Sequence, residues 1–396
     1  MFENKSIIIG VSGGIAAYKT AYLVSALSKT EADVNVIMTE NACEFISPLV
    51  FETLTENKCY VDTFDRNFKF DVEHISLAKK ADIFMIAPAT ANVIAKIANG
   101  IADDMLTTTF LASKCKKIVS PAMNTAMFEN QITQDNISKL KKYGIGVVEP
   151  QNGLLACGDT GAGKMPEPDF LFDVIEREIA REKDMLGKKV LVTAGATMES
   201  LDPVRFLTNH SSGKMGFAIA KEAMLRGAEV TVVKANTTAE IPNFVKIVEV
   251  SSAKDMFDAV TALSDQQDII VKAAAVADYT PECYVDSKIK KKDGDLSIPL
   301  KRTKDILKYL GENKREGQFL CGFSMETENM LENSKAKLSK KNADMIVANN
   351  LKDAGSGFKT DTNAVTLITR DGHRSLELKS KAEVAKEIFD EILGLI

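Results

Sequence analysis

The segment SIIIGV (Ser6–Val11), followed directly by SGGIAAYKTAYLVSAL (Ser12–Leu27), decides the fold of the first half of the chain. The first stretch is a short apolar run typical of a buried strand, and the second has Ala, Tyr and Leu at helical spacing. A strand, a glycine turn and a helix N-terminus together can hold a phosphate through free backbone amides. The spacing Gly10-x-x-Gly13-Gly14 matches neither GxGxxG nor a Walker A loop, so an ordinary tight turn is the alternative.

Further apolar segments extend this alternation of strand and helix through the first half. The expected strands are DVNVIMT (Asp33–Thr39), DIFMIA (Asp82–Ala87), KIVS (Lys117–Ser120) and IGVV (Ile145–Val148). Such alternation predicts a parallel, doubly wound α/β sheet whose ligands bind beyond the carboxyl ends of its strands. Small hydroxyl, amide and apolar groups stand at those ends, and they suit a planar cofactor with one phosphate: Ser12–Gly14, Thr39, Pro88–Asn92 and Pro121–Met127.

Size, charge and cysteine content limit the classes of protein to consider. A chain of 396 residues exceeds the ~250–300 residues at which one core tends to split, so two domains are expected. A net charge of −5 with interspersed signs favours neither nucleic acid nor a membrane surface as a partner. Six cysteines without a CxxC pair indicate free thiols in a reducing compartment. With no signal-like start and no apolar stretch of ~20 residues, we expect a cytoplasmic protein.

A second strand followed by glycine, KKVLVTAGAT (Lys188–Thr197), restarts the pattern, so we place a domain boundary between residues 186 and 187. A helix is expected from about Met215, and DIIVKAAAVADY (Asp268–Tyr279) has the character of a buried strand. The alternating segment Pro281–Arg302, with an Asp-Gly pair at its middle, predicts a β-hairpin arm. The second domain, 187–396, is therefore expected to be Rossmann-like with this arm attached.

The stretch QNGLLACGDTGAGKM (Gln151–Met165) places Cys157 in a glycine-rich segment. Glycines at this density predict a loop that can open and close, a flap at about 151–166, rather than a continuous helix or strand. A linker in which the cysteine is a small apolar filler is the alternative.

Several residues fit both a functional and an ordinary structural role. His74 can titrate near neutrality, but a histidine before a helix is commonly a surface or capping residue. Asn124 can bind a carboxylate or form a turn. Lys288 on the arm can reach a triphosphate, whereas Lys337 and Lys341, four residues apart on a helix, are usually solvent-facing. The segment SSGKMG is either a phosphate site at a helix N-terminus or an ordinary serine cap.

Five motifs of the first half resemble the flavin-binding cysteine decarboxylase family: VSGGIAAYK, EHISLAKKAD, PATANVIAKIANGIADD, PAMNTAMFEN and GLLACGDTGAGKMPEP. The resemblance implies a flavodoxin-like fold with bound FMN. It implies that His74 is the active-site base, that Asn124 recognises the substrate carboxylate and that Cys157 donates a proton from the flap. It further implies FMN binding by Ser12, Gly13, Gly14, Thr39, Thr90, Ala91 and Asn92, and substrate binding by Met127 and Lys164. At Lys164 the family usually has arginine.

The second half resembles the phosphopantothenate–cysteine ligase family through TAGAT, LDPVRFLTNHSSGKMG, AAVADY, SKIKKKDG, KDIL, GFSMET and KLSKKNADMIVANN. The resemblance implies CTP as the nucleotide, an acyl-cytidylate handled by Asn209, and a role for Lys288 in the first step. The CTP-binding residues that it implies are Lys272, Ala273, Ala274, Asp278, Lys288, Lys304, Asp305, Ile306, Leu307, Phe323, Lys337 and Lys341. Substrate binding is implied for Asn209, Ser211, Ser212 and Gly213. Arg302-Thr303-Lys304 departs from the Lys-Asn-Pro usual in this family.

Together the halves resemble the family of bifunctional bacterial coenzyme A biosynthesis proteins. The resemblance implies CTP- and Mg2+-dependent ligation of cysteine to 4′-phosphopantothenate, then FMN-dependent decarboxylation of the product to 4′-phosphopantetheine, in a dodecameric homo-oligomer. The metal ligands stay unassigned. Two other interpretations remain open. One is a flavin or nicotinamide oxidoreductase on two Rossmann-like domains, although GxGxxG is missing; the other is a non-catalytic flavoprotein that regulates a partner.

Overall fold

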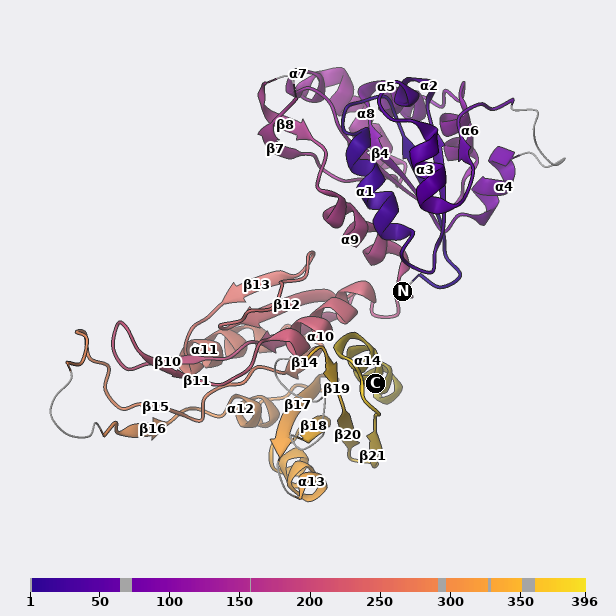
Figure 1. Ribbon diagram of the computed structural model, residues 1–396. Helices are drawn as coiled ribbons and strands as arrows, with labels where there is room; N and C mark the ends of the chain where they lie inside the picture. Colours follow the sequence, from indigo (N-terminus) through magenta and orange to yellow (C-terminus); the bar gives the residue numbers. More distant parts are fainter. Residues whose placement is uncertain (1, 65–72, 157, 291–296, 327–328, 351–359) are drawn as a thin grey trace. The chain divides into compact units, whose positions relative to one another are not determined.

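The computed structural model describes residues 2–64, 73–156, 158–290, 297–326, 329–350 and 360–396. The chain divides into two compact units, Met1–Arg181 and Glu182–Ile396 (Figure 1). The segment just after Arg181 packs with the second unit: the Met185 N–H donates to the carbonyl of Arg226 at 3.0 Å, and Asp184 forms an ion pair with Arg226 at 3.3 Å. The division therefore falls slightly before the boundary expected after residue 186.

A six-stranded parallel sheet with the order β3-β2-β1-β4-β5-β6 forms the first unit. Its strands are β1 (Ser6–Val11), β2 (Asp33–Met38), β3 (Cys59–Tyr60), β4 (Ile83–Ala89), β5 (Lys116–Pro121) and β6 (Gly146–Val147). This is the Rossmann order, and without the two-residue edge strand β3 it becomes the flavodoxin order. The expected doubly wound, flavodoxin-like fold is confirmed.

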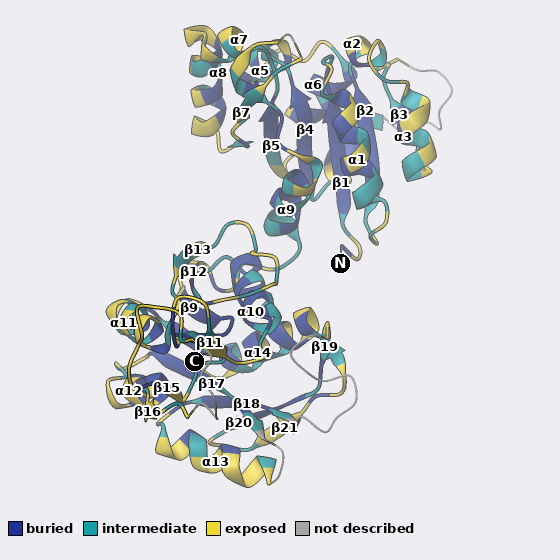
Figure 2. Cartoon of the chain, turned by 60° about the vertical axis from the view of Figure 1, so that its left-hand side comes forward, coloured by how far each residue is buried: buried dark blue, intermediate teal, exposed yellow. Residues whose placement is uncertain are grey.

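Helices cover both faces of this sheet. One group packs together from α1 (Ala17–Leu27), α3 (Pro48–Thr55) and α9 (Pro168–Ile179). A second group contains α4 (Glu73–Lys80), α5 (Ala91–Ala98), α6 (Met105–Ala112) and α8 (Gln131–Lys142), with α2 (Glu40–Cys43) and α7 (Thr125–Glu129) as short turns at strand ends. Figure 2 shows the strands as the buried layer and the outward helix faces as the exposed one. Loops at the strand ends are therefore free to form a site.

The segment expected to be a flap loop is instead an antiparallel hairpin, β7 (Gln151–Leu154) and β8 (Thr160–Lys164). Its glycines allow close packing rather than preventing a strand. Gly163 has φ +137°, and a Cβ there would lie 2.2 Å from the carbonyl oxygen of Met123. The Met123 N–H donates to the Gly163 carbonyl at 3.1 Å, which ties the hairpin to the chain after β5. The prediction of a segment without strands was wrong; Cys157 itself lies outside the described residues.

The second unit contains an eight-stranded sheet with the order β13-β12-β9-β14-β17-β18-β20-β21. The first six of these strands pair in parallel and the last two are antiparallel, so the Rossmann-like prediction is confirmed. The bounds are β9 (Lys189–Ala194), β12 (Glu229–Lys234), β13 (Lys246–Glu249), β14 (Ile269–Lys272), β17 (Phe319–Glu326), β18 (Met345–Asn350), β20 (Val365–Thr369) and β21 (His373–Ser375). The strand expected over 268–279 ends at Lys272, where the chain turns toward Gly195.

Three antiparallel pairs of short strands accompany this sheet. They are β10 (Met198–Ser200) with β11 (Phe206–Thr208), β15 (Tyr279–Pro281) with β16 (Leu300–Arg302), and β19 (Thr362–Asn363) with β22 (Lys379–Ser380). The β15–β16 pair is the base of the expected arm, which projects from the sheet beside β10 and β11 in Figure 1. The Asp293-Gly294 turn of the arm lies outside the described residues.

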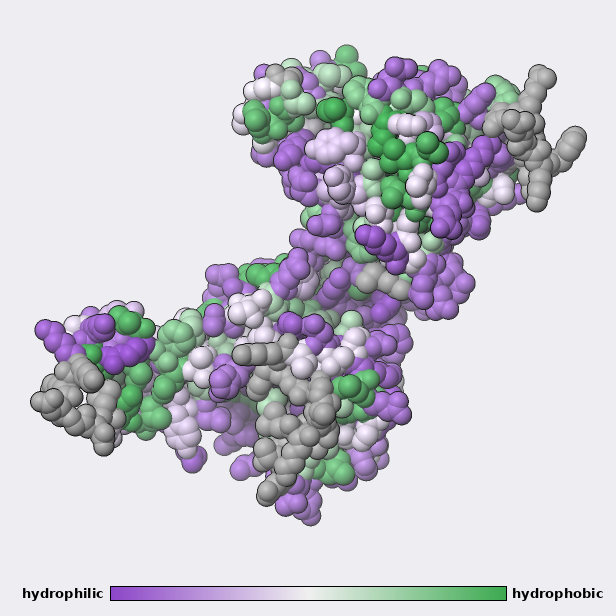
Figure 3. All heavy atoms as spheres, viewed as in Figure 1, coloured by the Kyte–Doolittle hydropathy of each residue, from purple (hydrophilic) through white to green (hydrophobic). Residues whose placement is uncertain are grey.

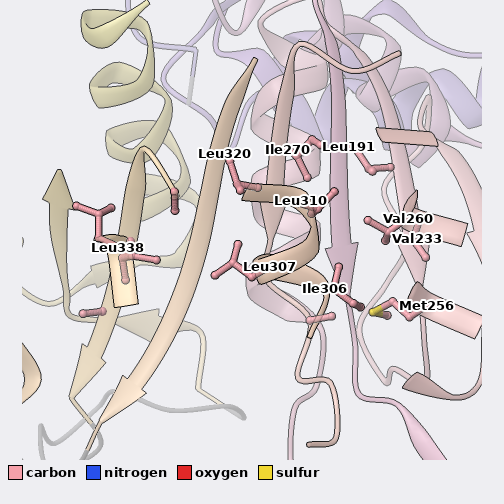
Figure 4. Packing of buried hydrophobic residues seen from close by; sticks show 14 of the residues in the cluster. Leu191, Val233, Met256, Val260, Ile270, Ile306, Leu307, Leu310, Leu320 and Leu338 are labelled. Atoms are coloured by element: carbon pink, nitrogen blue, oxygen red, sulfur yellow. The ribbon is translucent and has the colours of Figure 1, made fainter. Parts of the chain in front are cut away.

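The core of the second unit lies between the sheet and three helices. Figure 4 shows Leu191, Ile270 and Leu320 from the strands facing side chains from α11 (Ala253–Ser264), α12 (Ile306–Glu312) and α13 (Met330–Lys340). On the sheet's other face, α10 (Lys214–Leu225) packs against β9 and against α14 (Lys381–Leu395). Within the described ranges, no helix combines the length and apolar character needed to cross a bilayer.

Candidate functional sites

A cavity of about 590 Å3 in the first unit lies beyond the carboxyl ends of β1, β2 and β4. Its walls contain several residues expected to bind FMN or substrate: Gly13, Thr39, Thr90, Ala91, Asn92 and Met127. They also contain residues that the sequence did not single out: Glu40, Asn41, Asp62, Lys96, Asp103 and Met105. The volume is typical of small-molecule sites, which span roughly 300–1,000 Å3.

Ser12 connects the ends of β1 and β4 beside this cavity. Its hydroxyl is fully buried, donates to the carbonyl of Pro88 at 2.8 Å and accepts from the Thr90 N–H at 3.0 Å. Thr90 in turn caps α5 by accepting from the Val93 N–H. These bonds hold the glycine turn and the start of α5 at a fixed separation, with Ser12 behind the cavity wall rather than on it.

The glycine turn is closely packed at one position and open at the next. A Cβ at Gly13 would lie 2.6 Å from the Cβ of Asn41 and 2.9 Å from the backbone carbon of that residue. A Cβ at Gly14 would have a single neighbour within 4 Å, Thr90 Cγ2 at 3.8 Å. Gly13 is therefore required by packing, whereas a side chain at Gly14 would extend into open space.

The described wall of the first cavity carries four carboxylates, Glu40, Asp62, Asp103 and Asp104, against one cation, Lys96. Lys96 binds Asp103 at 2.7 Å and lies 3.5 Å from Asp104. The Lys96 hydrogen bond lowers the pKa of Asp103, and the same bond raises the pKa of Lys96. Among the described wall residues Lys96 is the one cation, so the cavity offers no concentrated positive charge.

Asn124 lies between the cavity and the β7–β8 hairpin. Its Oδ1 accepts from the Ala126 N–H at 2.8 Å, which caps α7, and its Nδ2 donates to Asp159 Oδ2 at 2.7 Å. Lys164, at the end of β8, pairs with Glu167 at 3.4 Å, and Glu167 also binds Lys19 at 2.8 Å. The amide of Asn124 is thus held by the hairpin that precedes and follows Cys157.

His74 is the second residue of α4 and is half-buried, but it is not part of the cavity wall. Helix α4 packs on α6, whose first residue, Met105, does line the cavity. Asn124 is also absent from that wall. His74 and Asn124 therefore come from different elements, and neither lies on the described wall of this cavity.

In the second unit, a cavity of about 420 Å3 lies at the carboxyl ends of β14 and β17. We call it the nucleotide cavity. Most residues expected to bind CTP line it: Lys272, Asp278, Lys304, Asp305, Ile306, Leu307, Phe323, Lys337 and Lys341. Ala273 and Ala274 line a neighbouring cavity instead, and Lys288 lines neither.

The nucleotide cavity is strongly cationic. Among the described residues, five positive side chains face two carboxylates: Lys272, Arg302, Lys304, Lys337 and Lys341 against Asp278 and Asp305. One of the cations, Lys341, forms an ion pair with Asp305. The remaining excess of positive charge in a concave site favours a polyanion such as a triphosphate.

Lys272 is the most perturbed of these cations. Desolvation, reinforced by the charge of Lys337, lowers the pKa of Lys272 to about 8. The ammonium group of Lys337 donates to the carbonyl of Phe323 at 2.8 Å. A bound polyanion would relieve the repulsion between Lys272 and Lys337, so an anion and a proton on Lys272 should bind together.

Three residues expected to bind the nucleotide, Lys304, Ile306 and Leu307, have side chains that pack against other parts of the second unit. Ile306 and Leu307 are 1% and 3% exposed, and Figure 4 shows both side chains in the hydrophobic core. Only their backbone can therefore face the nucleotide cavity. The Lys304 ammonium lies 4.6 Å from the centre of the Phe257 ring, a cation–π contact that directs it to one side.

Lys288 is exposed, but the residue after it is held in place. The Ile289 N–H donates to Asp202 Oδ2 at 3.0 Å, and the Ile289 carbonyl accepts from Arg205 Nη2 at 2.8 Å. The Arg205 guanidinium donates two hydrogen bonds to the Asp202 carboxylate, and the Asp202 side chain is fully buried. The Arg205 bond holds the pKa of Asp202 far below its ordinary value. We call this pair the arm clamp, since it fixes the backbone beside Lys288.

A second cavity of about 310 Å3 in the same unit shares the walls Lys272, Val276, Asp278, Phe323 and Lys337 with the nucleotide cavity. We call it the acid cavity, after the carboxylic acid substrate that the resemblance implies. It extends to Ser211–Gly213, directly before α10, where the sequence predicted substrate binding. The exposed Asn209 lies at its rim, because its Nδ2 donates to the carbonyl of Ala275 on the wall at 3.3 Å.

Sequence reasoning missed several wall residues of the second unit: Arg302 and Thr303 in the nucleotide cavity, and Lys214, Asn349, Asn363 and Lys381 in the acid cavity. The first two could have been found, because the expected hairpin pairs them with the segment that carries Asp278; the Thr303 N–H donates to the Asp278 carbonyl at 3.0 Å. Lys214 directly follows Gly213 in SSGKMG, the segment considered as a phosphate site, whereas Asn349, Asn363 and Lys381 come from three separate elements.

Comparison with known proteins assigns both units. Residues 1–180 match the family model "Flavoprotein", and residues 185–395 match "DNA/pantothenate metabolism flavoprotein C-terminal domain". The coenzyme A biosynthesis bifunctional protein of Bacillus subtilis is 46% identical over 100% of this chain and 98% of its own length. That of Haemophilus influenzae is 41% identical over 99% and 98%. The solved C-terminal domain of a coenzyme A biosynthesis bifunctional protein is 46% identical, covers 52% of this chain and 95% of that one, and has a TM-score of 0.45. This chain belongs to the family of coenzyme A biosynthesis bifunctional proteins.

Proposed function

We propose that the chain performs two successive steps of coenzyme A biosynthesis. The second unit joins cysteine to 4′-phosphopantothenate with CTP, and the first unit decarboxylates the resulting phosphopantothenoylcysteine to 4′-phosphopantetheine with FMN. Family membership supports this pair of activities. The observation that supports it in the structure is the contrast between the two cavities: one with five cations suits a triphosphate, and one of about 590 Å3 beside a glycine turn suits a flavin.

In the ligase unit, the carboxylate of the acid attacks the α-phosphorus of CTP and pyrophosphate leaves. Lys272, Lys337 and Lys341 stabilise the negative charge that develops on the phosphates. Lys288 reaches the same phosphates from the arm. The cysteine amine then attacks the acyl carbon, loses a proton and expels CMP, while Asn209 orients the acyl group at the rim of the acid cavity.

Magnesium is proposed to enter with the nucleotide rather than to occupy a site made by the protein. No group of three or more histidine, cysteine or carboxylate side chains in the described ranges could hold a metal ion. Mg2+ commonly binds substrate phosphates, water and only one or two carboxylates. Asp278 and Asp305 on the nucleotide cavity wall can supply those carboxylates.

The first cavity fits FMN in its size and in the chemistry of its walls. Gly13 leaves backbone, not side chain, toward the ligand, and Gly14 has free space in front of it. We propose that this turn, with Thr39 and Thr90–Asn92, holds the cofactor and that its phosphate lies at the turn. When bound, the flavin supplies the two-electron oxidation of the thiol-bearing carbon that makes loss of CO2 possible, and it later returns the electrons.

The remaining steps of the decarboxylation belong to side chains of the first unit. His74 is proposed to remove a proton from the substrate before CO2 leaves, and Cys157 to return a proton afterwards. Asn124 is proposed to bind the substrate carboxylate. Because its Nδ2 donates to Asp159 of the hairpin in the structure, the arriving carboxylate would compete with Asp159 for that donor. Lys164 and Met127 complete the proposed substrate contacts.

A homo-oligomer, dodecameric as the resemblance implies, is part of the proposal. Ile15, Tyr18 and Tyr22 form one exposed stripe on and before α1, with exposed fractions of 58%, 52% and 69%, and Leu49 on α3 is 65% exposed. Figure 3 shows apolar side chains gathered over α1 and α3 on this face. A contiguous apolar patch on a folded unit commonly marks a protein interface.

We also keep the cytoplasm as the proposed location, since Cys157 has to remain a free thiol.

The test supplies purified protein with 4′-phosphopantothenate, cysteine, CTP and Mg2+ and follows the products by mass spectrometry. We expect 4′-phosphopantetheine together with CMP, pyrophosphate and CO2. Cys157→Ser should release CO2 without forming 4′-phosphopantetheine, because a hydroxyl is a far weaker acid than a thiol of pKa ~8.5. His74→Asn should prevent CO2 release, and neither variant should alter ligation.

Two outcomes would contradict the proposal. Protein without visible flavin absorbance would remove the decarboxylase half, and oxidation that depends on nicotinamide without any ligation would favour an oxidoreductase. A more limited result would contradict the role of Cys157 alone: if Cys157→Ser makes 4′-phosphopantetheine at the normal rate, the segment that carries this residue is a linker.

A further inference from the structure

The far wall of the acid cavity contains a buried polar atom without a partner. Asn363, in β19, is 2% exposed, and its Oδ1 has no hydrogen-bond partner in the structure as described. Its Nδ2 donates to Asn349 Oδ1 at 3.3 Å, which orients the amide and leaves the carbonyl oxygen as the unused end. Leaving a buried acceptor unsatisfied is costly, so such an atom on a cavity wall indicates a hydrogen-bond donor on a ligand.

Positive charge stands beside Asn363 on the same wall. Lys381, the first residue of α14, is 7% exposed, and its Nζ donates to the carbonyl of Thr360 at 2.5 Å. Lys214, the first residue of α10, pairs with the exposed Asp361 at 2.6 Å. Burial, reinforced by the charge of Lys214, lowers the pKa of Lys381. Two ammonium groups, one carboxylate and the N-terminus of a twelve-residue helix therefore favour an anion at this end.

The two ends of the acid cavity differ in what they can bind. The near end shares Lys272 and Lys337 with the nucleotide cavity, so the carboxylate that is activated by CTP has to lie there. The far end presents Lys381, Lys214 and the Asn363 acceptor. 4′-Phosphopantothenate has its phosphate opposite its carboxylate, and its secondary hydroxyl is separated from the phosphate-bearing carbon by one quaternary carbon. An anion with a neighbouring hydroxyl donor is the combination that the far end can satisfy.

Given the proposed ligase function, we propose that Asn363 and Lys381 are specificity-determining residues of the ligase: Asn363 Oδ1 accepts from the secondary hydroxyl of the acid, and Lys381 binds its phosphate. Asn349 positions the Asn363 amide through the 3.3 Å hydrogen bond. The far end of the acid cavity then selects a phosphorylated hydroxy acid, while chemistry takes place at the near end.

The test compares three acids in the CTP-dependent ligation, using the full chain: 4′-phosphopantothenate, its 2′-deoxy analogue and pantothenate. Wild type should prefer the hydroxylated to the deoxy acid in kcat/KM, and Asn363→Leu, similar in shape but without an acceptor, should lower that preference about 10-fold. Lys381→Met should lower the preference for phosphorylated over unphosphorylated pantothenate, by about 10-fold or more. The KM for CTP and the decarboxylation of added phosphopantothenoylcysteine should stay unchanged in both variants.

Lys386→Met is the matched control, because Lys386 lies on the same helix as Lys381, pairs with Asp390 and is not on the wall of either cavity. It should keep both preferences. Preferences that are unchanged in Asn363→Leu and Lys381→Met, in protein that still ligates, overturn this inference alone; a wild-type protein that cannot ligate overturns the proposed function. If Asn363→Leu also loses CTP binding, that variant cannot be used. The inference then stands or falls on two results: whether wild type prefers the hydroxylated to the deoxy acid, and whether Lys381→Met lowers the preference for the phosphorylated acid.

Discussion

The first and second units arrange their leading strands in the same parallel order, yet they place very different charges at the strand ends. In the first unit, β1 is followed by a glycine turn packed on Asn41, and the cavity there contains Lys96 paired with Asp103 and Asp104. In the second unit, the nucleotide cavity has five cations and two carboxylates among its described wall residues. The shared strand order supplies the position of each site, and the side chains brought there decide its ligand.

The source of those side chains also differs between the units. The walls of the first cavity come mostly from the segments that follow β1, β2, β3 and β4, including the first turns of α2 and α5. The nucleotide cavity combines the end of β14 with the base of the arm, the start of α12 and the end of α13. The cations of the nucleotide cavity therefore come from a strand end, the base of the arm and the last turn of α13, and not only from loops that directly follow strands.

The largest effect expected is on the charge of the nucleotide cavity. Lys337→Glu removes one cation and adds one anion, so acyl-cytidylate formation should fall by roughly 1,000-fold, slightly more than the loss of a single preorganised contact. Lys335→Glu makes the same change of charge on the same helix, outside the cavity wall, and should have little effect. Decarboxylation should stay normal in both. A Lys337→Glu protein that ligates like Lys335→Glu would break the comparison of the two cavities.

The next effect concerns the arm and its clamp. Lys288→Gln should raise the activation free energy of acyl-cytidylate formation by roughly 3 kcal/mol if Lys288 reaches the phosphates. Asp202→Asn keeps the size of the clamp but weakens its bonds to Arg205 and Ile289, and should slow the same step about 10-fold without changing the decarboxylase. Asp286→Asn, an exposed residue of the arm, is the control. Normal single-turnover rates in Lys288→Gln would make it a solvent-facing lysine.

A third prediction concerns the phosphate in the first cavity. Gly13→Asp would weaken flavin binding, but a side chain there also collides with Asn41, so Gly14 gives a cleaner test. Gly14→Asp should reduce flavin affinity roughly 10- to 100-fold, by placing a carboxylate near the phosphate in a partly screened site. Gly14→Ala should keep its flavin. The measurement is the ratio of flavin to protein in the absorbance spectrum; full occupancy in Gly14→Asp would place the phosphate elsewhere.

The smallest effect is a dependence of CTP binding on pH. Because the pKa of Lys272 is lowered to about 8, the free site loses this charge as the pH rises through 8, and affinity for CTP should fall several-fold by pH 9.5. Binding should take up protons near pH 8–9, which calorimetry in buffers of different ionisation enthalpy detects. Lys272→Met should abolish the uptake; uptake that persists in Lys272→Met would assign it to another group.

The lowered pKa of Lys272 also affects the free energy of unfolding, which should rise with pH whereas the affinity for CTP falls. Between about pH 8 and the ordinary lysine value of 10.5, the unfolded chain binds a proton that the folded site does not. Lys272 therefore destabilises the folded protein below pH 8, and this cost is relieved as the pH rises to 10.5. A thermal melting series of wild type against Lys272→Met over this range, corrected for the common trend, should show the difference shrinking with pH.

Local patterns were sufficient to predict the main strands of both sheets. The apolar run SIIIGV and the helical spacing after it predicted β1 and α1, because burial imposes its period on the sequence of each element. Glycine content misled at 151–166, where the segment pairs as β7 and β8. There the glycines serve close contact with Met123, a requirement set by a residue far away in the sequence.

The sequence alone predicted the two α/β units, the strand ends at which we place the ligands, and the order of motifs that the family shares. Only the tertiary structure decided which side chains meet. It directed Ile306 and Leu307 into the core, joined Ile289 to Asp202 across 87 positions, and left Asn363 Oδ1 unpartnered on the acid cavity wall. The physical reason is that periodicity and spacing record what one element buries, whereas cavity walls are assembled from elements whose contacts leave no local pattern in the chain.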